Sequence, residues 1–427
     1  MKLTKKLLKG GKYLGSGSYG CVVSPFLPCK SHTQKFRTKK QNTQYVSKIL
    51  KYQDEDSIHE IRISDKIKKI DPTKTYFITY ETACKINTVP KHRNNTKQVE
   101  YTNNSLSYYD EINNQGRVKY SGYTKNNNKN NNNKKKCLID LRINPINIIM
   151  PYGGYDLFDL KHDYYNMLKN TNFSKNKQNA HFLKTYYLLK TNFKDCFKNL
   201  CIGLYKLHKN RIVNSDIKLE NIMANYNVKT NKVSLRYIDF GLSRELTERY
   251  CNNNDNIVLE GTYEYLSPEI YISYVLNKYY NEKSDYSIFN IIKKKINDNV
   301  KQTYEDLSEN DYINQLYKEH IDIKTKTKHD SIILKLYYEI RSHIKNKTLL
   351  HYYFGVKNVN SLDGYLQKGD VYSLGIAIYQ YIEYYYKIFD IKHSKNTKLY
   401  NLIKKMIHPD HNKRYNILQC LNDTYFN

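Results

Sequence analysis

The sequence predicts an α+β fold in two parts, a small strand-rich part over residues 1–152 and a larger helical part over residues 153–427. Before residue 152, apolar residues cluster in the short runs that are typical of strands. From residue 155 onward they recur at intervals of three and four, the spacing of a helix with one buried face. Hydrophobic residues make up 40% of the chain and aromatic residues 14%, enough for a substantial core. A wholly disordered chain is therefore excluded.

In the first part, apolar runs predict strands at residues 13–24, where two strands flank a glycine turn, and at residues 44–50, 75–80 and 146–152. Residues 55–70 have helical spacing, with Ile58, Ile61 and Ile67 on or near one face. Residues 87–136 are polar and end in an Asn/Lys tract. Because such a composition cannot pack a core, we expect a disordered insertion there.

In the second part, a long buried helix is predicted by apolar residues that recur at three and four: Phe193, Phe197, Leu200, Leu204 and Leu207. Residues 233–238 are expected to form a strand. Residues 371–379 are almost wholly apolar and predict a helix buried on all sides. A polar, Lys-rich stretch over about residues 276–360 is interpreted as a second insertion.

The net charge of +29 has two interpretations. It is typical of a protein that binds a polyanion such as nucleic acid, and it also follows from AT-rich coding, which favours Lys, Asn, Ile and Tyr. The eight cysteines form no Cys-x-x-Cys pair, which favours a reduced, intracellular protein without a zinc site. No run of 18 apolar residues exists and the mean hydropathy is −0.77, so no transmembrane segment is expected. The basic residues 1–12 lack the apolar stretch of a secretory signal.

A glycine pattern lies in the first predicted hairpin, where Gly15, Gly17 and Gly20 precede Val22. Glycine allows a backbone to approach a phosphate closely and to adopt conformations that a side chain would forbid. A plain hairpin explains this pattern equally well. A dinucleotide-binding fold would need a helix directly after the glycines, and the strand-forming residues there argue against one.

Lys48 lies on the predicted strand 44–50, and Glu60 lies on the helix that follows it. A lysine on a strand is usually a solvated charge. An ion pair with Glu60 would instead hold the ammonium group where it can meet nucleotide phosphates.

A series of short motifs follows in the second part: Asp216, Lys218 and Asn221; Asp239-Phe240-Gly241; Gly261-Thr262; Ser267-Pro268-Glu269; Asp370 with the five residues after it; and Arg414. This ordered set resembles the eukaryotic-type protein kinase family over about residues 14–421, apart from the two insertions. The resemblance implies a bilobal protein-kinase fold with a small β-rich N-lobe over residues 1–152 and a larger helical C-lobe over residues 153–427.

The resemblance also implies how this chain would bind ATP. The segment over the phosphates would consist of Leu14, Gly15, Ser16, Gly17, Ser18, Tyr19, Gly20, Cys21 and Val22. Val22 and Val46 would line the adenine pocket. Residues 150–153, which begin with Met150, would form the hinge. Lys48, braced by Glu60, would contact the α- and β-phosphates.

For the chemistry, the resemblance implies that Asp216 is the catalytic base that orients the acceptor hydroxyl. Lys218 would steady the γ-phosphate, and Asn221 and Asp239 would hold Mg²⁺. Phosphoryl transfer depends mostly on positioning and charge neutralisation, and oxygen ligands suit Mg²⁺. Of the other motif residues, Glu269 and Arg414 would form a structural ion pair, and Asp370 would brace the catalytic loop.

The chain departs from the family pattern directly before the base, where the usual His-Arg is Asn214-Ser215. Without that Arg no cation is available there to bind a phosphorylated activation loop, so we expect activity to depend little on such phosphorylation. Asn214 is expected to donate a hydrogen bond near Asp239 through its amide.

The expected function is that of an ATP-dependent serine/threonine protein kinase, because Lys218 and Thr262 match the serine/threonine pattern. Protein substrates are the expected partners, with nucleic acid at most accessory. The altered Asn214-Ser215 favours an alternative, a pseudokinase scaffold that binds nucleotide without efficient transfer. A kinase of small molecules or lipids is a third hypothesis.

The Asn/Lys tracts, the large insertions and residues 150–154 resemble the kinases of giant DNA viruses of the mimivirus group. AT-rich protists are a second possible source. The expected location is intracellular and soluble, which for a viral protein would mean the host cytoplasm or the virion.

Overall fold

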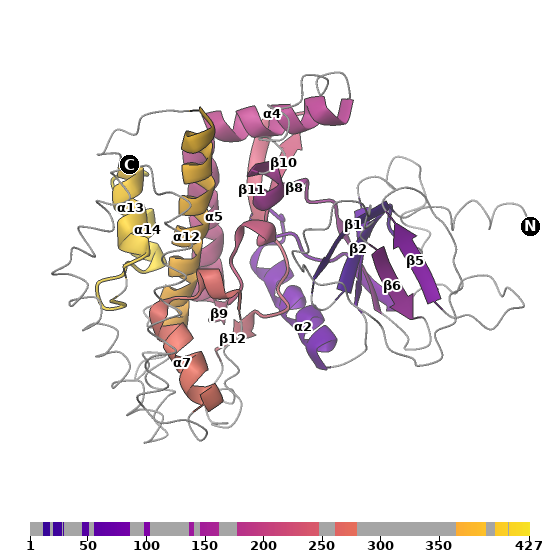
Figure 1. Cartoon of the computed structure of the whole chain (residues 1–427), viewed down its shortest axis with the longest axis horizontal. Coiled ribbons are helices and arrows are strands. Elements are labelled where there is room, and N and C mark those ends of the chain that lie inside the picture. The colour runs from indigo at the N-terminus through magenta and orange to yellow at the C-terminus, as the bar shows by residue number, and fades with distance from the viewer. Residues whose placement is uncertain are drawn as a thin grey trace, which may run out of the picture. The chain divides into compact units, whose positions relative to one another are not determined.

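The computed structural model of the chain (Figure 1) describes residues 12–17, 20–27, 29, 45–50, 55–85, 98–102, 136–140, 146–161, 177–246, 261–279, 364–389, 398–408 and 410–427. The chain divides into two compact units. Unit 1 comprises Met1–Lys69 and Ile78–Tyr152, and unit 2 comprises Ile70–Phe77 and Gly153–Asn427. Residues 70–77 therefore belong to unit 2, although they lie before residue 152, where the sequence places the boundary between the two parts.

Unit 1 contains an antiparallel five-stranded sheet in the order β1-β2-β3-β7-β4. The strands are β1 (Lys12–Gly17), β2 (Gly20–Ser24), β3 (Tyr45–Leu50), β7 (Ile146–Pro151) and β4 (Thr82–Lys85). Helix α2 (Glu55–Ile70) follows β3 and fully buries Ile63 and Ile67. The predictions confirmed in this unit are the hairpin over residues 13–24, the helix over 55–70 and the strands over 44–50 and 146–152.

The strand predicted at residues 75–80 is wrong. This segment is a loop organised by the buried carboxylate of Asp71, which accepts hydrogen bonds of 2.7–3.1 Å from the Thr73 hydroxyl and from the backbone N–H groups of residues 75–77. Because these N–H groups bond to a side chain, they cannot serve a strand ladder. The edge strand of the sheet is β4 instead.

The sequence places Ile58 on or near one face of this helix with Ile61 and Ile67, but its side chain is 53% exposed and so lies outside the buried face of α2. The buried face of this helix contains Glu60, two positions later. Two positions correspond to about 200° around an α-helix, so Ile58 and Glu60 cannot share one face. The charged residue therefore determines which face of α2 points inward.

The predicted disordered insertion contains a strand. Strand β5 (Gln98–Thr102) pairs antiparallel with β6 (Lys136–Asp140), with Val99 opposite Ile139. The alternation of polar and apolar residues in β5 is a strand signal, and the polar composition of the surrounding stretch hides it. The rest of that insertion, with most of its Asn/Lys tract, lies outside the described residues.

Cys29 and Cys84 form a disulfide whose Cα atoms are 5.7 Å apart. The expectation of reduced cysteines is therefore wrong for this pair. The two residues are separated by 55 positions and lie in no recognisable motif. Folding brings them together, because Cys29 packs in a small cluster with Phe26 and Ile149, and Cys84 lies against that cluster.

Unit 2 is mainly helical (Figure 1). Its named helices are α4 (Lys177–Thr191), α5 (Phe193–Lys209), α7 (Pro268–Tyr279), α12 (Tyr365–Phe389), α13 (Lys398–Met406) and α14 (Ile417–Leu421). Two single 3₁₀ turns are η4 (Leu219–Asn221) and η5 (Tyr263–Tyr265). None of the helices in the described part of the chain is long and apolar enough to cross a membrane.

The described strands of unit 2 form two small sheets. Strands β11 (Lys232–Tyr237), β10 (Ile222–Asn227) and β8 (Tyr155–Asp156) make one, and β12 (Arg244–Glu245) and β9 (Ile212–Val213) pair as the other. The predicted buried face of α5, the strand at 233–238 and the apolar helix at 371–379 are confirmed. Of the second predicted insertion, the first residues belong to α7, and residues 280–360 lie outside the described part.

Helix α12 lies between α5 and α13 in Figure 1, which explains its apolar sequence. Val371, Leu374, Ala377 and Ile378 have no exposed surface. A helix that is buried on several sides needs apolar residues all round.

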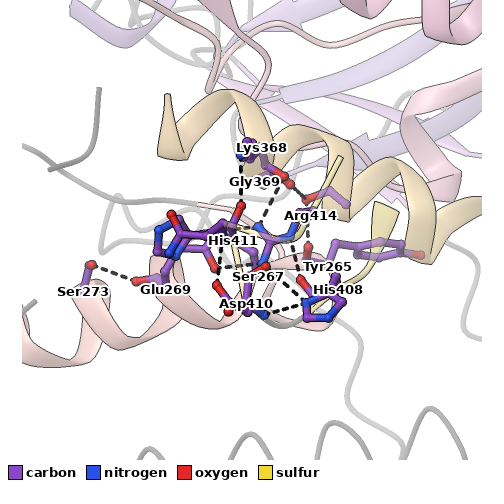
Figure 2. Close-up of polar contacts among 12 residues, drawn as sticks. Tyr265, Ser267, Glu269, Ser273, Lys368, Gly369, His408, Asp410, His411 and Arg414 are labelled. Atoms are coloured by element: carbon purple, nitrogen blue, oxygen red, sulfur yellow. Dashed lines mark hydrogen bonds and ion pairs between the residues drawn. The ribbon is translucent and has the colours of Figure 1, made fainter. Parts of the chain in front are cut away.

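A buried ion pair joins the start of α7 to the chain after α13 (Figure 2). Arg414 donates to both carboxylate oxygens of Glu269, with 3.0 Å between Nη2 and Oε2, and both side chains are fully buried. The Ser267 hydroxyl donates a further hydrogen bond of 2.7 Å to Glu269, and the Arg414 Nε donates one of 2.8 Å to the His408 carbonyl. The pair therefore holds together segments that are far apart in the sequence.

Replacing Glu269 with Ala should destabilise unit 2 by about 3–5 kcal/mol, because it leaves the Arg414 guanidinium buried without a counter-charge. The free energy of unfolding in urea measures this change. Ser267→Ala is the matched control, since it removes one hydrogen bond to the same carboxylate and should cost only about 1 kcal/mol. Equal costs for the two variants would contradict the assigned role of the ion pair.

Candidate active site

Unit 1 holds a buried ion pair between β3 and α2. The Lys48 Nζ lies 2.7 Å from the Glu60 Oε1, and the two side chains are 11% and 9% exposed. The structure thus brings together the lysine and glutamate that the sequence predicts to pair. Isolated charges are costly to bury, so each depends on the other to keep its place. The pair fixes the position of one ammonium group on the sheet.

The glycine pattern lies in the antiparallel hairpin of β1 and β2. Gly15 pairs with Val22 and Gly17 pairs with Gly20, after an irregularity in the register between Tyr13 and Gly15. Strand β2 in turn places Val22 opposite Lys48 on β3. Of the other residues predicted to bind phosphate, Ser16 lies opposite Cys21 in the strand pair, and Leu14 lies at the irregularity in the register. Ser18 and Tyr19 lie outside the described residues.

The predicted adenine-pocket residues Val46 and Met150 are opposite each other on β3 and β7. Val46 is buried and Met150 is half-buried. Gly154, just after the predicted hinge, has a φ of +97°, and a Cβ there would lie 2.2 Å from the Ala224 carbonyl oxygen. Only glycine fits at this position.

In unit 2, three side chains converge on the carboxylate of Asp216. Its Oδ1 accepts a hydrogen bond of 2.7 Å from the Thr262 hydroxyl, and its Oδ2 lies 2.8 Å from the Lys218 Nζ and 2.9 Å from the Asn221 Nδ2. Lys218 also donates to the Thr262 hydroxyl oxygen at 2.9 Å. A carboxylate held by this many donors has one orientation, which is what a positioned base requires.

Thr262 is the member of this cluster to which the sequence assigned no catalytic contact. It lies 46 positions after Asp216, and its only signal was the Gly-Thr pair used above to judge specificity. The structure shows that its hydroxyl bridges Asp216 and Lys218.

Asn221 and Asp239 have the chemistry of a magnesium site. The Nδ2 group of Asn221 donates both to the backbone oxygen and to the Oδ2 of Asp216, each at 2.9 Å, which leaves its Oδ1 as the atom that can bind a cation. The Ile238 N–H donates to the Asn221 carbonyl at 3.0 Å, so Asn221 lies next to the residue that precedes Asp239. An amide oxygen and a carboxylate are ligands that Mg²⁺ accepts. The residues present therefore fit the metal that the sequence predicts.

The loop that carries Asp216 is anchored to helix α12 by Asp370. This carboxylate, 3% exposed, accepts hydrogen bonds from the backbone N–H groups of Asn214, at 2.7 Å, and Ser215, at 2.9 Å. It also bonds to the His208 Nε2 at 3.0 Å. The sequence predicted the bracing role of Asp370, whereas His208, in the last turn of α5, gave no signal of its own.

Acidic side chains surround Asp156 on β8. The pKa of Asp156 is raised from 3.8 to about 7, first by burial and then by the nearby carboxylates of Asp159 and Glu220. Burial likewise raises the pKa of Glu220, which the Lys218 ammonium partly offsets. This side of unit 2 therefore disfavours additional negative charge at neutral pH.

Because the pKa of Asp156 is higher in the folded chain than in the unfolded chain, folding favours its protonated form. Its stabilising contribution is fully present below pH 3.8 and is lost as the pH rises toward and through 7, at about 1.4 kcal/mol per unit of pKa shift. The uncharged Asp156→Asn variant should gain melting temperature relative to wild type between pH 5 and pH 8. Asp195→Asn, at an exposed position on α5, is the matched control for replacing a carboxylate with an amide. A difference for Asp156→Asn that stays constant across this pH range would show that this carboxylate is not destabilised.

Comparison with known proteins supports one interpretation of this geometry. Residues 144–426 match the protein kinase domain family. A segment of 91 residues is 37% identical to the serine/threonine-protein kinase nekl-2 of Caenorhabditis elegans, covering 21% of this chain and 22% of that protein. A segment of 85 residues is 36% identical to human myosin light chain kinase 2, skeletal/cardiac muscle, covering 20% of this chain and 13% of that protein.

A probable serine/threonine-protein kinase of Dictyostelium discoideum is 37% identical over 86 residues, 20% of this chain and 8% of that protein. The chain thus spans less than a quarter of the length of each of these relatives. The family match covers well over half of the chain and contains the Asp216 cluster, Asp239, Asp370 and the Glu269–Arg414 pair. This chain belongs to the protein kinase domain family.

Proposed function

We propose that this protein is a serine/threonine protein kinase that transfers the γ-phosphate of ATP to hydroxyl groups of protein substrates. The observation that carries the proposal is the Asp216 carboxylate, held by Thr262, Lys218 and Asn221 on a loop that Asp370 anchors. A base in one fixed orientation beside a lysine suits a reaction that depends on positioning and charge neutralisation.

In the proposed mechanism, Asp216 accepts a hydrogen bond from the substrate hydroxyl and takes its proton as the new oxygen–phosphorus bond forms. The bond between the γ-phosphorus and the oxygen that bridges it to the β-phosphate breaks in the same step, and ADP leaves. Lys218 supplies positive charge beside the transferred group. Thr262 fixes the positions of Lys218 and Asp216 relative to each other, because its hydroxyl bonds to both. The substrate hydroxyl would displace the Thr262 hydroxyl or share the Asp216 carboxylate with it.

The kinase domain implies ATP as the phosphate donor and Mg²⁺ as the ion that neutralises its charge. Asn221 and Asp239 would hold the metal. Lys48, fixed by Glu60, would contact the α- and β-phosphates. The backbone of the β1–β2 hairpin would cover the phosphates, and Val22, Val46 and Met150 would contact adenine. We further propose that unit 1 corresponds to the N-lobe and unit 2 to the C-lobe.

The serine/threonine specificity is supported by two observations. Lys218 contacts both Asp216 and Thr262, so the residues that match the serine/threonine pattern also contact one another. The relatives named above are, by name, serine/threonine-protein kinases or a myosin light chain kinase. The resemblance to giant-virus kinases remains a prediction, since those relatives come from an amoeba, a nematode and a mammal.

The pseudokinase alternative is less well supported. A scaffold that only binds nucleotide has no need for a base held by three side chains, and each of the predicted catalytic residues Asp216, Lys218 and Asn221 takes part in that cluster. The altered residues Asn214 and Ser215 contribute their backbone N–H groups to Asp370 whatever their side chains are.

Incubating the purified chain with γ-labelled ATP, Mg²⁺ and a peptide library tests the proposal. We expect phosphoserine and phosphothreonine as products. Phosphotyrosine as the main product would contradict the specificity. Nucleotide binding without any transfer would favour the pseudokinase.

Asp216→Asn and Asp239→Asn should separate the two proposed roles. Asp216→Asn should lower kcat by at least about a thousandfold while leaving the Kd for Mg·ATP largely unchanged, because the base acts on the acceptor hydroxyl. Asp239→Asn should instead weaken Mg²⁺-dependent binding of ATP. Calorimetric titration with and without Mg²⁺, beside kinetics, measures both, and an equal loss of ATP affinity in the two variants would contradict this division.

A further inference from the structure

The side chain of Asn214 reaches the backbone of the proposed base. Its Oδ1 accepts a hydrogen bond of 3.1 Å from the N–H group of Asp216, two positions later. Since the partner is an N–H donor, the atom that faces it must be the amide oxygen. The sequence predicted that Asn214 donates near Asp239, and the structure shows that its oxygen accepts from Asp216 instead.

The residue between them explains why such a bond matters. Ser215 has a φ of +66°, in the left-handed region that residues other than glycine rarely adopt. This conformation turns the chain sharply just before Asp216. A backbone in a rarely adopted conformation persists only where its surroundings hold it. Here the Asn214 side chain holds the turn by accepting the hydrogen bond from the Asp216 N–H group.

Asn214 is also a junction between three segments. Its own N–H donates to Asp370 on α12 at 2.7 Å, and its carbonyl accepts a bond of 3.0 Å from the Ser243 hydroxyl, which follows the Asp239-Phe240-Gly241 segment. Asn214 is 2% exposed and Ser243 fully buried, so water cannot easily replace these bonds. The backbone of Asn214 is therefore fixed, and a fixed backbone gives its side chain a defined direction.

We propose that Asn214 is a positioning residue for phosphoryl transfer, whose side-chain oxygen fixes the peptide of Asp216 and thereby the direction of its carboxylate. The inference rests on the proposed function. Three of the four bonds that hold this turn, two to Asp370 and one from the Ser243 hydroxyl, use backbone groups of residues 214 and 215, and those groups remain after any substitution there except proline. The fourth depends on the Asn214 side chain. Asn214, which departs from the family pattern, thus supplies through its own side chain the bond that holds the N–H group of Asp216.

Steady-state kinetics of peptide phosphorylation by the full chain tests this inference. Asn214→Ala should lower kcat at least about tenfold, equivalent to about 1.4 kcal/mol, because a misdirected base loses transition-state interactions. The KM for ATP should change by less than about threefold, since the nucleotide is not contacted.

Two variants should rescue the loss. Asn214→Asp keeps an acceptor oxygen at the same place, and Asn214→Ser offers a hydroxyl that can close the same turn without a charge. Either variant that keeps the wild-type melting temperature should have a kcat within about threefold of wild type. If both fold normally and neither recovers activity, the inference is wrong.

Ser243→Ala is the matched structural control. It removes a buried hydrogen bond to the Asn214 carbonyl, while the two bonds to Asp370 still hold the backbone of residues 214 and 215 and the Asp216 N–H still donates to Asn214 Oδ1. We expect a similar fall in melting temperature but a change in kcat of less than about threefold. A kcat that falls in parallel with stability in both variants would show that Asn214 is merely structural.

Hydrogen exchange at the Asp216 amide separates this inference from the proposed function. Exchange should be faster in Asn214→Ala than in wild type and in Ser243→Ala, because only that variant frees the N–H group. If the wild-type chain transfers no phosphate, the proposed function fails, yet faster exchange still supports the contact. Unchanged exchange, or an active Asn214→Ala enzyme with the kcat of wild type, overturns the inference.

Discussion

The loop that carries Asp216, the proposed base, depends on one buried carboxylate, that of Asp370. It is 3% exposed and accepts hydrogen bonds from the backbone of Asn214 and Ser215 and from the His208 ring. A charged group is costly to bury unless strong donors surround it, and here two of the donors come from the loop itself. The loop can therefore satisfy Asp370 only in a narrow range of conformations. Because Asp370 lies on the largely apolar helix α12, the core of that unit determines where the proposed base is held.

Two buried ion pairs elsewhere in the chain also fix the positions of the groups around them. Lys48 with Glu60 in unit 1 and Arg414 with Glu269 in unit 2 each remove a cation and an anion from water. Such pairs add little net stability relative to apolar residues of similar size, but breaking one is costly. What they provide is position, since each partner keeps the other in place. The proposed reaction depends on charges in fixed positions. Holding them there therefore offsets the free-energy cost of removing them from water.

Local patterns in the sequence predicted much of this structure. The glycine hairpin, the apolar face of α5 and the spacing of Asp216, Lys218 and Asn221 are short-range signals, and the structure reproduces all of them. These features could be predicted because the residues that make them are neighbours in the chain. The ordered motifs were sufficient to identify the family.

The errors arose where a distant or competing partner decides the outcome. Asp71 takes the N–H groups that a strand at residues 75–80 would have used, and the pairing of Glu60 with Lys48 turns Ile58 outward. Neither effect appears in hydrophobic periodicity, which records apolar residues alone. The contact from Thr262 to Asp216 spans 46 positions, so only the folded chain shows it.

Phosphoryl transfer by the Asp370→Asn variant, with hydrogen exchange across residues 212–221, tests most directly whether the buried carboxylate orders the base. The substitution keeps the size of the side chain but replaces one of its two acceptor oxygens with a donor. Because the N–H groups of Asn214 and Ser215 donate to different oxygens of Asp370, the variant can accept from only one of them. We predict faster exchange in this loop and a loss of kcat of at least about a hundredfold, while helix α14 keeps its protection. Wild-type turnover with an unprotected loop, or unchanged exchange with lost turnover, would contradict the account.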